Sequence, residues 1–175
     1  MIPKVMNFFW VEGVMSWARY MSVYSFCKMN PGWTVRVYLC PPNDVTGKGW
    51  VGPQMQDYFM YEGADYFPRM QELPVDIRQW EVDPPKGDTR CDWVRILSCV
   101  QKSDIFTWYI LHEEGGFYSD MDILYIKPID EYYEGIKDCD VTMCFTDAAG
   151  YYHFSIGFLA AQAGNTLYRD LWRYS

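Results

Sequence analysis

The first forty residues of the chain contain two apolar segments separated by a segment with helical periodicity. Residues Val5–Trp10 are an almost continuous apolar run, which is typical of a strand buried on both faces. Apolar side chains then recur at helical spacing from Trp17 to Cys27, and Thr34–Leu39 alternates as a second strand would. This strand–helix–strand order predicts a parallel pair of strands joined by a right-handed crossover.

Shorter segments of both kinds follow. We predict further strands over residues 75–82, 117–119, 123–126, 141–145 and 155–161. Helices are predicted over residues 103–114 and 166–174, with another beginning at Asp88 or Thr89 and a short one near Met55–Tyr61. No repeat or linker divides these segments, so we expect residues 1–175 to form one α/β domain, by itself or within a longer polypeptide.

Charge and composition narrow the classes of function. The chain carries 15 basic and 23 acidic residues, for a net charge of −8, which opposes general binding to nucleic acid. Half of the residues are apolar, so the chain can form a sizeable core. Aromatic residues make up 19% and can both fill that core and stack on flat or ring-shaped ligands. An anionic ligand would therefore have to be held locally, by a metal ion, backbone amides or a few basic side chains.

Segments for targeting or cross-linking are not evident in the sequence. No apolar run approaches the roughly 18 residues of a transmembrane helix, and the N-terminus lacks the pattern of a signal peptide. We therefore expect a cytoplasmic protein without a transmembrane segment. The six cysteines include no Cys-x-x-Cys pair, and we expect them to be reduced thiols of the core.

Two aspartates form the most informative local motif, in the segment Gly115–Asp122. Asp120 and Asp122 follow a short apolar strand, and side chains two residues apart point the same way along extended backbone. Carboxylates placed so close repel each other unless a cation lies between them. Mn²⁺ and Mg²⁺ accept oxygen ligands and bridge to phosphates, so the pair is a candidate metal–diphosphate clamp. The same tripeptide could also be a solvated acidic turn.

Several further segments form a recognisable pattern together with Gly115–Asp122. They are Ile2–Trp10, Asn30–Trp33, Ser103–Phe106 and Lys127–Ile129. In this order they resemble a known family, the DXD-containing sugar-binding region of glycosyltransferases, which includes the yeast mannosyltransferases that start outer-chain N-glycans and the glucosylating toxins of clostridia. The resemblance extends over about residues 2–130, with a weaker match over residues 155–170.

The resemblance implies a GT-A fold, a Rossmann-like α/β/α sandwich with a mixed, mostly parallel central sheet. It further implies a UDP- or GDP-sugar donor, a glycan or glycoprotein acceptor, and Mn²⁺ or Mg²⁺ near Asp120 and Asp122. Asp104 would accept hydrogen bonds from the donor sugar, and Trp10 would stack on or border the base. The residues expected at the donor are Phe9, Trp10, Val11, Ser103, Asp104, Tyr118, Asp120 and Met121, and those expected to be catalytic are Asp104, Asp120 and Asp122.

The chain also departs from the family pattern. Thr107 stands where the family usually has an arginine, so the basic contact to the donor would be lost or supplied elsewhere, by Lys102 or Arg95. A nucleotide-sugar-binding domain without transferase activity is therefore the main alternative. A metal-dependent phosphoryl-transfer enzyme such as a nuclease is a third hypothesis, which the charge of −8 disfavours.

The expected stereochemistry depends on whether a base is present. The known relatives retain the anomeric configuration, so we expect retention. An inverting enzyme would need a positioned base, for which Asp147 and His153 are the candidates. Elsewhere, helical spacing places Trp17, Trp93 and Trp108 in the core, and the pair Glu113–Glu114 is expected to be a solvated helix end.

Overall fold

A six-stranded sheet forms the centre of the protein. The computed structural model describes residues 1–11, 13–41, 61–80, 99–148 and 151–174, excluding the side chains of 146–148, 151–153 and 174. In sheet order the strands are β3 (Asp76–Gln79), β2 (Thr34–Cys40), β1 (Val5–Val11), β4 (Gly116–Ser119), β6 (Tyr151–Ala161) and β5 (Val141–Ala148). Pairing is parallel from β3 to β4, and β6 runs antiparallel to both of its neighbours. The predicted mixed, mostly parallel sheet is confirmed.

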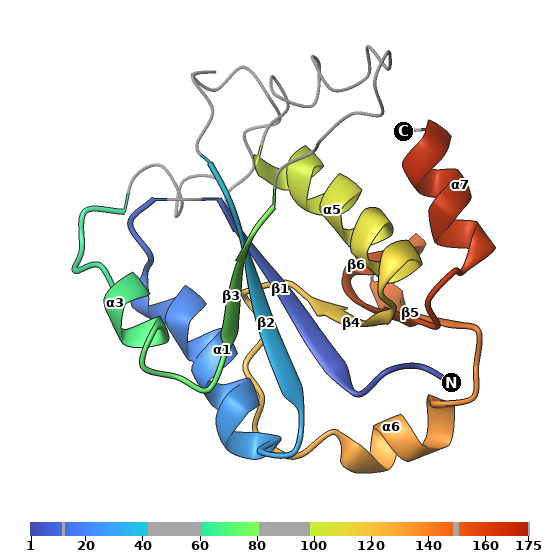
Figure 1. Cartoon of the computed structure of the whole chain (residues 1–175), viewed down its shortest axis with the longest axis horizontal. Helices are drawn as coiled ribbons and strands as arrows, with labels where there is room; N and C mark the ends of the chain where they lie inside the picture. Colours follow the sequence, from blue (N-terminus) through green and yellow to red (C-terminus); the bar gives the residue numbers. More distant parts are fainter. Residues whose placement is uncertain (12, 42–60, 81–98, 149–150, 175) are drawn as a thin grey trace.

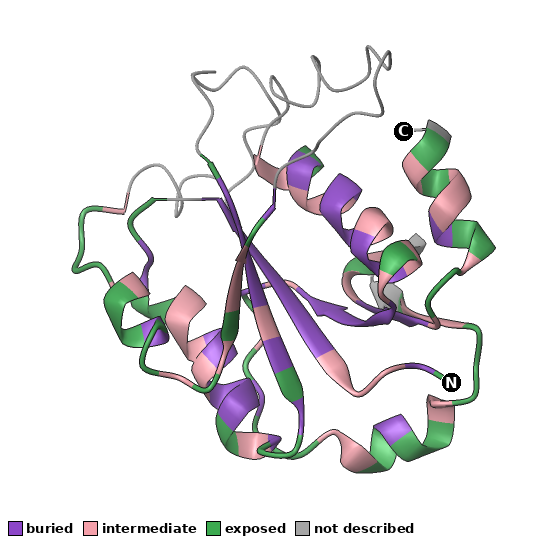
Figure 2. Ribbon diagram, viewed as in Figure 1, coloured by how far each residue is buried: buried purple, intermediate pink, exposed green. Residues whose placement is uncertain are grey.

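Helices cover both faces of this sheet, so the domain has three layers (Figure 1). One face carries α1 (Trp17–Met29), α3 (Phe67–Met70) and α6 (Asp130–Ile136), and the other carries α5 (Cys99–Glu113) and α7 (Thr166–Tyr174). Figure 2 shows that the middle strands are buried along most of their length. Their side chains alternate between two cores: Phe8 packs toward α1, whereas Phe9 packs toward α5. This two-sided burial explains the continuous apolar run of β1.

Three elements differ from the prediction, and one of them is α3, which was not predicted. The expected strand over residues 123–126 is an irregular loop, in which Leu124 and Ile126 are exposed while Tyr125 is buried. The backbone N–H of Tyr125 donates to Ser25 of α1, so the segment is tied to a helix and imitates the alternation of a strand. Helix α6 was not predicted. The helices expected from Asp88 or Thr89 and near residues 55–61 fall, except for their ends, outside the described residues.

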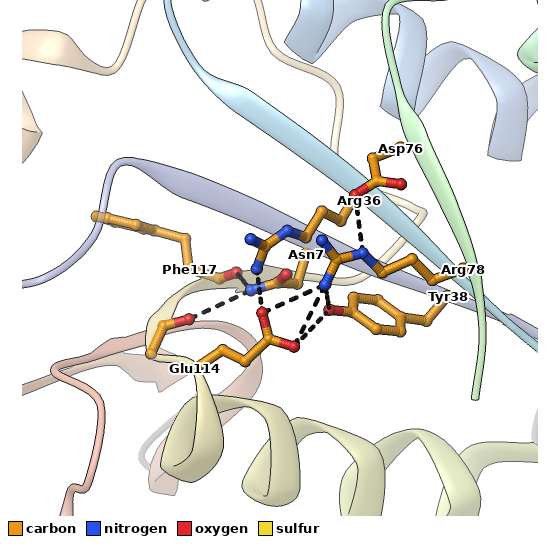
Figure 3. A network of polar contacts seen from close by, with 8 residues as sticks. Asn7, Arg36, Tyr38, Asp76, Arg78, Glu114 and Phe117 are labelled. Atoms are coloured by element: carbon orange, nitrogen blue, oxygen red, sulfur yellow. Dashed lines mark hydrogen bonds and ion pairs between the residues drawn. The ribbon is translucent and has the colours of Figure 1, made fainter. Parts of the chain in front are cut away.

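A polar network at the C-terminal end of α5 corrects the expectation of a solvated helix end there (Figure 3). Glu114 accepts hydrogen bonds from Arg36 of β2 and from Tyr38, and Arg78 of β3 lies 3.4 Å from both of its carboxylate oxygens. A carboxylate at a helix C-terminus is opposed by the helix dipole, and the two guanidinium groups offset that cost. Glu113 is exposed, as expected.

The sharp turn from α5 into β4 requires glycine. Gly115 and Gly116 have φ angles of 68° and 95°, and a Cβ on Gly116 would lie 2.9 Å from the carbonyl oxygen of Val5. Asn7 of β1 donates to the carbonyl of Phe117 at 2.9 Å and so fixes the start of β4 (Figure 3). The Gly-Gly pair therefore leads the chain directly into β4, which ends at Ser119, one residue before Asp120.

Some further expectations concern single side chains. Trp17 is 56% exposed, so its expected place in the core is wrong, because it lies at the open start of α1. Trp108 packs against the core, and Trp93 lies outside the described residues. The five described cysteines are free thiols, but only Cys27 and Cys40 are buried and Cys139 is exposed. Within the described ranges, no helix has the length and apolar character needed to cross a membrane.

Candidate functional site

A cavity of about 240 Å³ opens at the carboxyl ends of β1 and β4, between α1 and α5. The sheet extends from β1 to β2 on one side and to β4 on the other, so the cavity lies at the point where the strand order reverses. It is lined by all the residues expected near the donor and the metal: Phe9, Trp10, Val11, Ser103, Asp104, Tyr118, Asp120, Met121 and Asp122. The fold thus brings segments about a hundred residues apart in the sequence into one site.

Asp120 is held by a chain of hydroxyl groups from β4 and α5. The phenol of Tyr118 donates to Oδ1 of Asp120 at 2.8 Å, and the same phenol lies 2.6 Å from Oγ of Ser103. Burial raises the pKa of Tyr118 well above its usual value, so the phenol stays protonated and can donate a hydrogen bond to the carboxylate. The backbone N–H of Asp120 donates to the carbonyl of Gly157 in β6 at 2.8 Å. Hydrogen bonds therefore fix both the backbone of Asp120 and its side-chain carboxylate.

Two serines of α1 hold the loop that carries Asp122. Ser22 Oγ donates to the carbonyl of Ile123 at 2.7 Å, and Ser25 Oγ accepts from the N–H of Tyr125 at 3.1 Å. Both serines are buried. The sequence reading missed them, although polar residues three apart on the apolar face of a helix are a usable signal. They act by positioning the loop.

Asp104 and Asp120 make the cavity strongly acidic. Burial raises the pKa of Asp104 to about 7, and the charge of Asp120 raises it as well. Burial also raises the pKa of Asp120, against the lowering effect of the hydrogen bond from Tyr118; repulsion by Asp122 raises it further, and Arg19 lowers it. Both carboxyl groups would hold their negative charge more readily beside a cation.

The pair Asp120 and Asp122 fits a divalent cation that shares its ligands with a substrate. Both line the cavity, although Met121 and Asp122 lie in a turn and not on extended backbone. Over the ranges that the structure covers, no group of three or more His, Cys, Asp or Glu side chains could hold a metal ion. Mg²⁺ commonly binds through one or two carboxylates plus the phosphates of a substrate, and this donor set matches that pattern.

The bordering residues give the cavity an apolar wall. Trp10 is only 6% exposed and belongs to the core toward α1, so it fits a role at the border of a ligand better than an open stacking face. Phe9 and Val11 line the cavity from the opposite face of the same strand. Ile156 of β6, which was not singled out from the sequence, completes the lining.

The basic side chain found at the cavity is not one of those expected to supply the contact to the donor. Thr107 is buried and donates to the carbonyl of Ser103, and Lys102 is buried with its Nζ 3.6 Å from Cys40 Sγ. Neither is among the described residues that line the cavity, whereas Arg19 of α1 is. Arg95 and the side chains of the candidate bases Asp147 and His153 lie outside the described residues.

The three-layer architecture with a mixed, mostly parallel sheet is that of the GT-A fold. The family model described as "Glycosyltransferase sugar-binding region containing DXD motif" matches residues 10–137. The chain therefore belongs to this family of DXD-containing glycosyltransferase regions.

The likeness to one solved structure supports the fold. The chain is similar to the PaToxG glycosyltransferase, with 17% identity and a TM-score of 0.66, over 98% of this chain and 59% of that one. It is also similar to the glycosyltransferase GlyE of Streptococcus pneumoniae TIGR4, with 11% identity, a TM-score of 0.49 and coverage of 98% and 36%. An active-site mutant of LgtC is similar as well, with 13% identity and a TM-score of 0.45, over 98% of this chain and 60% of that one. This chain thus spans less than two thirds of each of these proteins. No curated protein matches the sequence.

Proposed function

We propose that this chain binds a UDP- or GDP-sugar together with Mn²⁺ or Mg²⁺ and transfers the sugar to a hydroxyl group of a glycan or glycoprotein. The observation that carries this proposal is the meeting of Asp104, Asp120 and Asp122 in one cavity at the strand switch point. Membership of the DXD-containing family supports it. The proposal extends beyond family and fold to donor class, metal dependence and reaction.

Each carboxylate has a distinct task in this proposal. Asp120 and Asp122 would hold the cation, which when bound would neutralise the diphosphate and act as a Lewis acid on it. Asp104, across the cavity on α5, would accept hydrogen bonds from two neighbouring hydroxyls of the donor sugar. Ser103 and Tyr118 would contact the donor while they hold Asp120 in place.

The nucleoside would lie against the apolar wall of the cavity. Trp10 would border the base, and the backbone of Phe9 and Val11 would run along it at the end of β1. Met121 lies between the two aspartates of the motif and lines the same space. In the proposed arrangement the base would lie toward β1 and the diphosphate toward β4.

We propose that transfer proceeds with retention. The bond between the anomeric carbon and the departing phosphate oxygen breaks, and the acceptor oxygen bonds to that carbon on the same face. The departing phosphate oxygen takes the proton of the acceptor hydroxyl, so no protein base is needed. Asp104 would hold the sugar and the metal-bound diphosphate would be the leaving group, so in this proposal each of the three lining carboxylates has a binding task.

Exposed aromatic rings near the cavity support a sugar as acceptor. Phe145 and Phe154 face each other across β5 and β6 with ring centroids 5.7 Å apart, and are 58% and 64% exposed. Two residues further along β6, Ile156 lines the cavity. Aromatic rings offer an apolar face to the C–H groups of a sugar ring.

Thermal stability provides the first test. Wild type and Asp122→Ala are melted with a panel of UDP- and GDP-sugars, with and without Mn²⁺, and Asp138→Ala serves as the control because Asp138 is exposed outside the cavity. A ligand that binds only the native state raises the midpoint by mass action. We expect a Mn²⁺-dependent rise with one donor, lost in Asp122→Ala and kept in Asp138→Ala. No rise with any donor would refute the proposal.

A second measurement separates a transferase from a binding domain. The stabilising donor is incubated with Mn²⁺ and a panel of simple glycosides, and products are identified by mass spectrometry. We expect a glycoside product whose anomeric configuration, read by NMR, matches that of the donor sugar. Donor binding without transfer or hydrolysis would favour the nucleotide-sugar-binding alternative, and an inverted product would overturn retention.

A further inference from the structure

Arg19 occupies a distinctive place at the mouth of the cavity. It lies in the first turn of α1, where its backbone N–H donates to the side chain of the N-cap residue Ser16 at 3.4 Å. Its side chain is 18% exposed and lines the cavity, with Nη1 3.9 Å from Oδ2 of Asp122. The guanidinium group is thus beside the motif that would carry the cation.

This location opposes the helix dipole. The N-terminal end of a helix carries partial positive charge, so a cation in the first turn is unfavourable there and an anion is favourable. The contact with Asp122 offsets part of this cost, but 3.9 Å is longer than a hydrogen bond and the Asp122 side chain is 45% exposed. An anion in the cavity close to Arg19 would be favoured both by the guanidinium group and by the N-terminal end of α1.

The balance of charges in the cavity also favours Arg19 as a contact for an anionic ligand. Three carboxylates line it, from Asp104, Asp120 and Asp122, and Arg19 is the basic side chain among its described lining residues. A diphosphate would add two more negative charges, and the carboxylates and the diphosphate together would exceed the charge of a single divalent cation. A guanidinium group suits this task because its planar set of N–H donors matches two phosphate oxygens at once.

We propose that Arg19 is a phosphate-binding residue of the donor site, an inference that rests on the proposed function. In the free protein Arg19 pairs with Asp122. With Asp122 engaged by the cation, the guanidinium group of Arg19 would be available to bind the diphosphate. There it stabilises the charge that grows on the departing diphosphate. Arg19 thus supplies from α1 the basic contact that Thr107 cannot supply from α5.

Two measurements with opposite expected signs test this inference. Mn²⁺ binding without nucleotide is followed by electron paramagnetic resonance, and binding of UDP and GDP at saturating Mn²⁺ is followed by calorimetry. Arg19→Gln should bind Mn²⁺ as tightly as wild type or more tightly, because a competing positive charge beside Asp122 is gone. The same variant should bind the preferred nucleoside diphosphate at least tenfold more weakly, and Arg19→Lys should fall between.

The control is Lys28→Gln, which removes one positive charge from the exposed last turn of the same helix. It should change neither affinity. Equal nucleotide affinity in Arg19→Gln and wild type would overturn this inference and leave the proposed function standing. A parallel loss of Mn²⁺ and nucleotide binding in Arg19→Gln would also overturn it, because it would show a structural role. Absence of nucleotide binding in wild type would refute both proposals.

Discussion

Gly157 of β6 provides the space that the carboxylate of Asp120 occupies. A Cβ placed on Gly157 would lie 2.9 Å from Oδ2 of Asp120, closer than carbon and oxygen normally approach. The carbonyl of Gly157 also accepts the N–H of Asp120 at 2.8 Å, so the two backbones cannot easily move apart. The glycine therefore sets the orientation of one of the two carboxylates proposed to bind the cation.

We expect Gly157→Ala to weaken metal binding with little effect on folding. The added methyl group would push Oδ2 of Asp120 away, because the other oxygen is held by Tyr118. Changes to residues that orient metal ligands typically lower metal affinity about 10- to 100-fold. Titration of Mn²⁺ in the presence of UDP or GDP measures this loss. Gly135→Ala in α6 is the matched control, since its methyl group would meet nothing within 4 Å; equal Mn²⁺ affinity in both variants would contradict the prediction.

Tyr118→Phe should make metal binding more sensitive to acid. The phenol of Tyr118 lowers the pKa of Asp120, so its removal raises that pKa and leaves more of the carboxyl protonated at low pH. Protons compete with the cation, so the loss of Mn²⁺ affinity relative to wild type should be larger at pH 6 than at pH 8. Tyr125→Phe removes another buried phenol, which donates to Ser119 and not to Asp120, and should show no such dependence. A loss of equal size at both pH values would argue against the hydrogen bond as its cause.

The fold class was predictable because its signals are local. The apolar run of β1, the periodicity of α1 and the alternation of β2 each lie within one segment, and a parallel connection follows from their order. The loop at 123–126 has the alternation of a strand, but among the described residues no strand pairs with it. Its conformation is decided by Ser22 and Ser25, about a hundred residues earlier in the sequence. Sequence periodicity cannot report such a contact.

The candidate site divides in the same way. Asp120 and Asp122 were found because their spacing is itself a chemical signal. Arg19 and Gly157 were missed, because their importance arises only when α1 and β6 are brought beside the carboxyl end of β4. A cation in the first turn of a helix, three residues after an N-cap serine, is a local sign that could have marked Arg19.

Asp104→Asn should stabilise the protein increasingly as the pH rises. Burial raises the pKa of Asp104 from 3.8 to about 7, so between these values the folded state holds a proton that the unfolded state releases. The free energy of unfolding of the wild type then falls as the pH rises through this window. Above about pH 7 the stabilisation that the protonated carboxyl group of Asp104 provides is lost. The asparagine does not titrate. Urea unfolding at pH 5, 6, 7 and 8 with a chelator present measures the difference in the free energy of unfolding between Asp104→Asn and wild type. A difference that stays constant across this range would refute the raised pKa of Asp104.

Glu114→Gln should lower stability without affecting the donor site. The change leaves Arg36 and Arg78 without their shared anion, at a cost of about 1–2 kcal/mol after allowance for partial exposure of the carboxylate. The network lies about 15 Å along α5 from Asp104, at roughly 1.5 Å per residue, so nucleotide affinity should not change. Glu113→Gln alters the adjacent, exposed carboxylate and should change stability by no more than about 0.5 kcal/mol. Urea unfolding and nucleotide titration check both claims; similar stability losses in the two variants would mean that the network of Figure 3 does not hold α5 against β2 and β3.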